Sequence, residues 1–238
     1  MQLRVFSYNI HKGKGPLIGS VRLHDLIAEV AGRKADLVLC QEVFHGMRAG
    51  PWDQSRDLAA GLDLVALYEP NAVYSKGHHG NTTLTRLDVG AVANHNLSTN
   101  PLEKRGVLYS SHPIGGHQLH VFNTHLGLNN RQRRHQAGRI CQIIEEKCGD
   151  GGPILLAGDF NDWTGGLGEL LRARAGLQNA FAGLVRERRV SWPSNRPFFD
   201  LDRIYFRGLH LVEARVHQAA PWTRLSDHLP VEAEFALE

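Results

Sequence analysis

Short apolar runs of strand length recur along the whole chain, and they restrict its fold more than any other feature of the sequence. Each run is rich in Val, Ile, Leu or Phe and has turn-forming residues at its ends, which is typical of β-strands. The predicted strands cover residues 3–8, 36–40, 63–67, 82–87, 106–110, 117–123, 153–157, 201–206, 209–216 and 231–235.

Helical patterns lie between some of these strands. The first has Ser20 as its expected N-cap and Gly32 after its last turn. Its apolar stripe consists of Leu23, Leu26, Ile27, Val30 and Ala31. A second helix is capped by Asn129 or Asn130, and its inward face carries Ala137, Ile140, Cys141, Ile144 and Cys148. A third is indicated by Leu167, Leu170 and Leu171. Strands and helices mixed in this way predict an α/β fold with two packed β-sheets and helices outside.

The composition is that of an ordinary globular protein. Its 238 residues are 42% apolar and 21% charged, which excludes disordered and collagen-like classes. We expect one domain over residues 1–238. No apolar run approaches the roughly 20 residues that cross a bilayer, and the first residues lack the apolar core of a signal peptide, so we expect a cytoplasmic protein. An odd number of cysteines without Cys-x-x-Cys spacing favours reduced packing residues: Cys40, Cys141 and Cys148.

The segment Gly158-Asp159-Phe160-Asn161-Asp162 directly follows one predicted strand. A buried strand that ends in Gly-Asp-x-Asn delivers a carboxylate and a carboxamide, two residues apart, to the same side of the strand end. Turns also favour Gly, Asp and Asn, so an ordinary turn is the alternative interpretation.

Asp202 lies inside a predicted strand of β-branched and aromatic residues, where a buried carboxylate needs a partner. One candidate is the neighbouring Arg203, in a structural ion pair. The other is His228 in Ser226-Asp227-His228, because a carboxylate bonded to an imidazole fixes its tautomer and raises its basicity. We pair Asp202 with His228. For Asp227 and His228 the alternative is a capping Asp beside a surface His.

Three further strand ends carry polar groups. Glu42 ends an apolar run, where a carboxylate is out of place unless it binds a cation, and hard oxygen ligands suit magnesium or manganese. His125 is a catalytic or a structural histidine, and Asn9 places an amide at the end of the first strand. Six strand ends that each carry one polar group are typical of a hydrolytic metal site.

In chain order these residues resemble the endonuclease/exonuclease/phosphatase superfamily, which includes pancreatic-type deoxyribonuclease, abasic-site endonucleases, inositol-phosphate phosphatases and bacterial sphingomyelinases. The motifs are Asn9, Gln41-Glu42, Asn123-Thr124-His125, Gly158-Asp159-Phe160-Asn161, Leu201-Asp202-Arg203-Ile204 and Ser226-Asp227-His228. Segments 71–81 and 103–109 are similar to an uncharacterised bacterial branch. The resemblance implies a four-layer α/β sandwich, in which two packed mixed sheets are flanked by helices, and metal-assisted, in-line attack of water on phosphorus.

The resemblance also implies a metal site. Glu42 is implied as the principal ligand of Mg²⁺ or Mn²⁺, with Asp227 and Asn9 near the same ion. Asp159 and Asn161 are implied to position the attacking water and the phosphate, or to hold a second metal. Asn9 and Asn161 would also contact the phosphate.

The same resemblance assigns the remaining site residues. His228, held by Asp202, is implied as a general base or a phosphate-stabilising acid. His125 and Arg105 would donate hydrogen bonds to the phosphate oxygens, where charge develops in the transition state. For Arg105 the alternative is a surface ion pair with Glu103.

Two regions depart from the family. Abasic-site endonucleases carry a carboxylate two residues after the first-strand Asn, where this chain has His11, so we do not expect abasic-site specificity. In pancreatic-type deoxyribonuclease a Glu supports the histidine that matches His125. Here that region offers His78 and His79, which either line a pocket or are solvated loop residues.

Arginine clusters bear on the substrate. Arg131, Arg133 and Arg134 open a predicted helix, where cations oppose the helix dipole, so they are candidates for contact with a phosphate backbone. A solvated face is the alternative. The irregular, arginine-rich stretch 180–197 is expected to be an exposed loop.

Two tryptophans lie near the motifs. Trp163 and Trp222 either cover part of a substrate or belong to the core. With a net charge of +3, the features place a nucleic-acid phosphodiesterase first. A phospholipid or small-molecule phosphoesterase comes second and a non-catalytic binding scaffold third. The sequence indicates no obligate protein partner.

Overall fold

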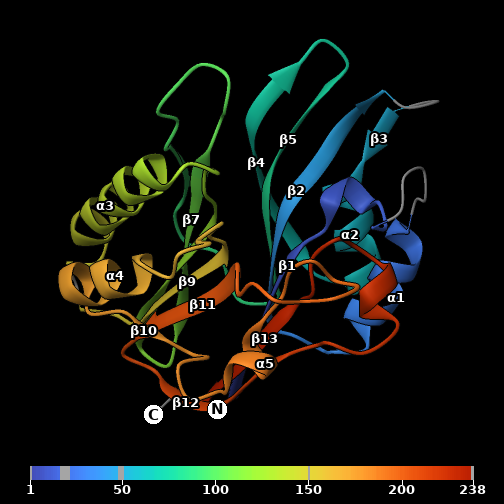
Figure 1. Cartoon of the computed structure of the whole chain (residues 1–238). Helices are drawn as coiled ribbons and strands as arrows, with labels where there is room; N and C mark the ends of the chain where they lie inside the picture. The colour runs from blue at the N-terminus through green and yellow to red at the C-terminus, as the bar shows by residue number, and fades with distance from the viewer. Residues whose placement is uncertain (1, 17–21, 48–50, 150, 237–238) are drawn as a thin grey trace.

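Two β-sheets pack face to face and helices cover their outer faces (Figure 1). The computed structural model describes residues 2–16, 22–47, 51–149 and 151–236. The predicted four-layer α/β sandwich is therefore confirmed.

The first sheet has the strand order β12-β13-β1-β2-β5-β4, and β3 pairs with β2. Its strands are β1 (Gln2–Asn9), β2 (Leu37–Met47), β3 (Pro51–Asp53), β4 (Val65–Tyr74), β5 (Gly77–Thr85), β12 (His210–Val216) and β13 (Val231–Ala236). Strands β1 and β2 are parallel, and β1 and β13 are antiparallel, so the sheet is mixed.

The second sheet has the order β10-β11-β9-β8-β7-β6. Its strands are β6 (Val92–Asn96), β7 (Gly106–Ile114), β8 (His117–His125), β9 (Ile154–Asp159), β10 (Gln178–Asn179) and β11 (Asp202–Arg207). Strands β8 and β9 are parallel, whereas β11 runs antiparallel to β9.

Helices cover the outer face of each sheet (Figure 1). Helices α1 (Leu23–Ala31) and α2 (Gln54–Leu62) pack on the first sheet, and α3 (Asn130–Lys147) and α4 (Leu167–Ala175) pack on the second. Shorter helices are η1 (His11–Gly13), α5 (Arg186–Arg189) and η2 (Trp222–Arg224).

Strand periodicity explains why the apolar runs are nearly continuous. Successive side chains of a strand point to opposite faces of the sheet. In β1, Leu3 and Val5 enter the core between the sheets, whereas Phe6 and Tyr8 pack in the core under α1. Both faces are buried, so both sets of positions are apolar.

The predicted elements recur with shifted ends, and the additional elements are β3, β6, β10, α2, α5, η1 and η2. The proposed cap Ser20 lies outside the described residues. Asn129 caps α3 as predicted, since its Oδ1 accepts from Arg131 N at 2.9 Å. The expectation of an exposed loop over 180–197 is wrong in part, because Ser191 and Ser194 are fully buried.

The three cysteines are buried thiols that form no disulfide with one another, as expected. No helix within the described ranges is both long and apolar enough to span a membrane. The cytoplasmic location stays a prediction.

Candidate active site

The two parallel strand pairs end at one edge of the sandwich and bring the predicted polar residues together. Asn9 lies beside Gln41 in the register of β1 and β2, and His125 lies beside Asp159 in that of β8 and β9. The antiparallel β11 places Asp202 opposite Asp159. Residues far apart in sequence thus meet because parallel strands share a carboxyl-terminal edge.

A buried amide network joins the sheets at this edge. Gln41 Nε2 donates to Asn123 Oδ1 at 2.8 Å. Asn123 Nδ2 donates in turn to the carbonyl oxygens of Cys40, at 3.2 Å, and Thr82, at 2.9 Å. These bonds cross from one sheet to the other, so the network fixes β2 against β8.

A β-bulge presents Glu42. The register of β2 with β5 shifts between Cys40 and Val43, and Glu42 has a φ of +56°. Bulges redirect a side chain, and a left-handed non-glycine residue is strained unless its surroundings hold it. The bulge therefore interrupts the regular pairing of β2 with β5 and changes the direction of the Glu42 side chain.

Glu42 is surrounded by basic groups. Lys12 Nζ lies 3.3 Å from Glu42 Oε2. Burial alone would raise the pKa of Glu42, but the charges of His125, Lys12, His11 and His228 outweigh burial and lower the pKa to about 2. The carboxylate is therefore ionised throughout the physiological range.

Asp227 is the second half-exposed carboxylate. Its Oδ1 lies 3.5 Å from His11 Nδ1 and accepts from Ser226 Oγ at 3.3 Å. Ser226 Oγ also contacts the carbonyl oxygen of Asn9, at 2.7 Å. These bonds hold the loop before β13 against the end of β1.

Deeper in the site, a chain of hydrogen bonds and ion-pair contacts begins at Ser191. Ser191 Oγ donates to Asp202 Oδ2 at 2.6 Å, and His228 Nδ1 lies 2.8 Å from the same oxygen. His228 Nε2 lies 3.6 Å from Asp159 Oδ2, which accepts from Asn9 Nδ2 at 3.0 Å. All five residues are buried. The predicted contact between Asp202 and His228 is present, and its catalytic role stays a prediction.

The carboxylates in these contacts favour the protonated imidazole of His228. Burial alone would lower the pKa of His228, but the carboxylates of Asp202 and Asp159 outweigh it and raise that pKa to about 10. Burial raises the pKa of Asp159 to about 6, against the opposing charge of His228. At neutral pH His228 is therefore a donor, and Asp159 is a weaker acid than an ordinary aspartate.

His125 borders the same carboxylate. Its Nε2 lies 3.4 Å from Asp159 Oδ2. Burial, reinforced by the charge of Arg105, lowers the pKa of His125 well below its usual value. Arg105 Nη2 donates to Glu103 Oε1 at 2.9 Å, which is the ion pair considered as its alternative role.

Backbone geometry fixes the Gly-Asp-Phe-Asn segment. A Cβ atom at Gly158 would lie 1.8 Å from the carbonyl oxygen of Thr124, so only glycine allows β9 this close to β8. Asn161 has a φ of +48°; its N–H donates to Asp159 Oδ1 at 2.9 Å, and its Nδ2 to the carbonyl of Leu126 at 2.9 Å. This loop is more constrained than an ordinary turn.

Arg203 is not the partner of Asp202. Its Nη1 lies 2.9 Å from Asp162 Oδ2, and its Nη2 lies 3.5 Å from Asp200 Oδ1. Asp202 and Arg203 are neighbours on β11, and neighbouring side chains on a strand point to opposite faces. The structural alternative for Asp202 is therefore wrong.

Two substrate-contact candidates are buried instead. Arg133 donates to the carbonyl oxygens of Gly127 and Leu128, so its place in a phosphate-binding surface is wrong. Trp222 belongs to the core beside Phe6, with ring centroids 5.6 Å apart.

The histidines of β5 are not solvated loop residues. His78 Nδ1 lies 2.7 Å from Tyr68 OH, and His79 Nε2 lies 2.9 Å from Tyr74 OH. Both histidines are half-buried on a strand.

The expected ligands separate into two groups. Within the described part of the chain, Asp159, Asp202 and His228 offer ligand atoms within 4.8 Å of one another. Two carboxylates lie outside this cluster: Glu42 faces Lys12, and Asp227 faces His11. Sequence reasoning missed Lys12 and Ser191, because neither belongs to a motif and their partners come from distant segments.

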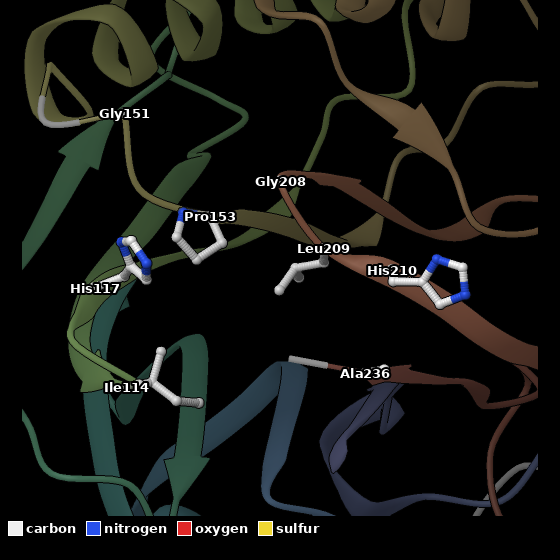
Figure 2. A pocket seen from close by; sticks show the side chains of 9 residues that line it. Ile114, His117, Gly151, Pro153, Gly208, Leu209, His210 and Ala236 are labelled. Carbon is white, nitrogen blue, oxygen red and sulfur yellow. The ribbon is translucent and has the colours of Figure 1, made fainter. Parts of the chain in front are cut away.

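A separate cavity of about 420 Å³ lies at the opposite ends of the strands (Figure 2). Its lining includes Pro153, which precedes β9, and Ala236, which ends β13. Asp159 ends β9 on the other side, so this cavity has no part in the site.

A model of the Endonuclease/Exonuclease/phosphatase family matches residues 6–228. The chain is 34% identical over 244 residues to the Uncharacterized protein YbhP of Escherichia coli K12, with 98% of this chain and 96% of that protein covered.

Solved structures share the fold. An endonuclease/exonuclease/phosphatase from Bacteroides vulgatus has a TM-score of 0.82 at 20% identity, with 100% of both chains covered. A mannosyl-6-phosphatase from Bacteroides thetaiotaomicron has a TM-score of 0.76 at 19% identity, with 99% of this chain and 100% of that chain covered. Members of the matching family are hydrolases of phosphate esters, and this chain belongs to the endonuclease/exonuclease/phosphatase family.

Proposed function

We propose that the protein is a divalent-metal-dependent phosphoesterase that hydrolyses phosphodiester bonds, with nucleic acid as the first substrate class. The observation that carries the proposal is the buried chain from Ser191 through Asp202 and His228 to Asp159, beside the ionised Glu42. We also propose that residues 1–238 act as one domain, because Leu3 and Phe235 share the core between the sheets.

The donor set fits a hard divalent cation. Glu42 is ionised and Asp227 is half-exposed, and both carboxylates already face basic side chains. Together with the amide oxygen of Asn9 they would hold Mg²⁺ or Mn²⁺, which prefer oxygen ligands. When bound, the ion supplies positive charge that neutralises the phosphate oxygens.

The protein's own residues supply proton transfer and positioning. Asp159, with a pKa raised to about 6, accepts a proton from the attacking water, and Asn161 fixes its carboxylate. His228 carries a proton at neutral pH and donates it to the leaving oxygen as the bond from that oxygen to phosphorus breaks, while Asp202 fixes the ring. His125, Arg105, Asn9 and Asn161 are the proposed phosphate contacts.

A small-molecule phosphoesterase is the second candidate. The burial of Arg133 removes one of the cations that favoured nucleic acid. A structural relative covered almost completely by this chain is described as a mannosyl-6-phosphatase.

The test is hydrolysis of bis-p-nitrophenyl phosphate, p-nitrophenyl phosphate, plasmid DNA and phospholipid vesicles, with Mg²⁺, Mn²⁺ or EDTA. Turnover should require the metal and fall about 10³-fold in Glu42→Ala, whereas Glu145→Ala, which removes an exposed carboxylate of α3, should match wild type. Full activity in EDTA or in Glu42→Ala contradicts the proposal. A steep salt dependence on DNA supports a nucleic-acid substrate, and salt-insensitive cleavage of small phosphoesters supports the second candidate.

A further inference from the structure

A second cavity, of about 370 Å³, lies outside the candidate active site between the loop after β9 and the segment that contains α5. Its lining includes Trp163, Arg186, Arg189, Phe198, Phe199 and Arg203. We call these six residues the arginine-aromatic pocket. Its volume is within the range of pockets that hold small ligands.

The pocket contains more basic than acidic groups. Its lining has three guanidinium groups and one carboxylate, that of Asp200. Asp200 is shared, because its Oδ2 lies 3.4 Å from Arg189 Nε and its Oδ1 lies 3.5 Å from Arg203 Nη2. Arg203 also pairs with Asp162.

Arg186 is the cation that is available to a ligand. It is exposed, and within the described ranges its side chain bonds a backbone carbonyl, that of Phe198, at 3.4 Å, and pairs with no carboxylate. A guanidinium group offers several donors in a planar fork that matches phosphate oxygens. The excess charge of the pocket therefore suits a phosphate group.

The same pocket has an aromatic wall. Trp163 packs edge-on against Phe199, with ring centroids 4.9 Å apart. The ring centroids of Phe198 and Phe199 are 4.7 Å apart. Phe198 remains 48% exposed. An exposed aromatic ring next to an available arginine is the combination that binds a base and its phosphate.

The pocket adjoins the segments that form the active site. Trp163 N donates to the carbonyl of Asn161 at 3.0 Å. Ser191, two residues after Arg189, donates to Asp202 Oδ2 at 2.6 Å. A ligand in the pocket would therefore contact segments continuous with Asn161 and Ser191.

We propose that the arginine-aromatic pocket binds a nucleotide, with its phosphate on Arg186 and Arg189 and its base against Phe198 and Trp163. The nucleotide is either free or part of a polynucleotide. This binding does not depend on the proposed hydrolytic function, because none of these residues belongs to the catalytic set.

The experiment is titration calorimetry in EDTA with AMP, ribose 5-phosphate, inorganic phosphate and a short single-stranded DNA. Arg186→Ala should weaken AMP binding about tenfold. Arg188 lies on the same short helix but lines a different cavity, so Arg188→Ala should leave AMP binding unchanged. Phe198→Ala should weaken binding of AMP but not of ribose 5-phosphate. Thermal melts check that the variants are folded.

Each outcome decides the proposal. Absence of AMP binding at millimolar concentration, or equal effects of Arg186→Ala and Arg188→Ala, overturns it. Equal affinity for inorganic phosphate and AMP also overturns it, because the base then contributes nothing. DNA binding with the same Arg186 dependence identifies a polynucleotide, and AMP binding alone identifies a free nucleotide. Glu42→Ala, the inactive variant under the proposed function, must bind AMP like wild type.

Discussion

Two buried pairs at the ends of β9 and β11 look alike but have different surroundings. Asp162 Oδ2 lies 2.9 Å from Arg203 Nη1, and Asp202 Oδ2 lies 2.8 Å from His228 Nδ1. The first pair forms its remaining hydrogen bonds with groups outside the candidate active site. Asp162 accepts from Leu167 N at 3.1 Å, and Arg203 Nη1 contacts Tyr205 OH at 3.1 Å.

The second pair continues into the site. His228 Nε2 lies 3.6 Å from Asp159 Oδ2, and Asp202 Oδ1 is buried with no hydrogen-bond partner within the described part of the chain. A buried ion pair with every group satisfied is a structural element, whereas one with spare donor and acceptor capacity is suited to chemistry. Burial and distance alone do not distinguish the two pairs.

The largest expected effect concerns His228. His228→Gln keeps an amide near Asp202 but cannot transfer a proton, so turnover of bis-p-nitrophenyl phosphate should fall about 10³-fold. The free energy of unfolding should also fall, by about 3 kcal/mol, because Asp202 loses its buried counter-ion. Steady-state kinetics and urea denaturation measure both quantities. If activity survives this change, the second pair is as structural as the first.

Arg203 should matter for stability but not for turnover. Arg203→Met leaves Asp162 buried without its counter-ion, which should lower the free energy of unfolding by about 3–5 kcal/mol. The turnover number of the folded fraction should stay within about threefold of wild type, because Arg203 faces away from Asp159. Urea denaturation and kinetics at low temperature provide the test. A stable but inactive Arg203→Met protein would refute the assignment.

The smallest expected effect is in the pH dependence of stability. The pKa of His228 is raised to about 10, so its contribution is complete below its unfolded value of about 6.5 and is lost as pH rises through 10. Burial alone would raise the pKa of Asp162, but Arg203 lowers it. That contribution is complete above the usual value of about 3.8 and is lost as pH falls through the lowered value.

Asp202→Asn separates the two dependences. It should remove an alkaline loss on the order of 1–2 kcal/mol while the acid loss due to Asp162 remains. Urea denaturation between pH 3 and 10, at intervals of about one pH unit, measures both the acid and the alkaline loss of stability. If wild type and Asp202→Asn lose the same stability at alkaline pH, the Asp202–His228 pair is not the cause of that loss.

Local sequence patterns were sufficient for much of the fold. Apolar runs located most strands because both faces of each sheet are buried. They missed β6, whose side chains are half-buried or exposed, and α2, where two of the three buried residues, Gln54 and Ser55, are polar. Residues 180–197 looked like a loop because the buried Ser191 and Ser194 are polar, and their bonds are to distant segments.

The sequence by itself determined the fold class, most of the strands and the polar residue types near their ends, because these depend on neighbouring residues and on a two-residue period. Only the tertiary structure decided which groups meet. Asn9 and Asp159 are 150 residues apart and Asp202 and His228 are 26 apart. The two-residue period directs Asp202 and Arg203 to opposite faces of β11, but only the packing of the two sheets brings His228 to within 2.8 Å of Asp202.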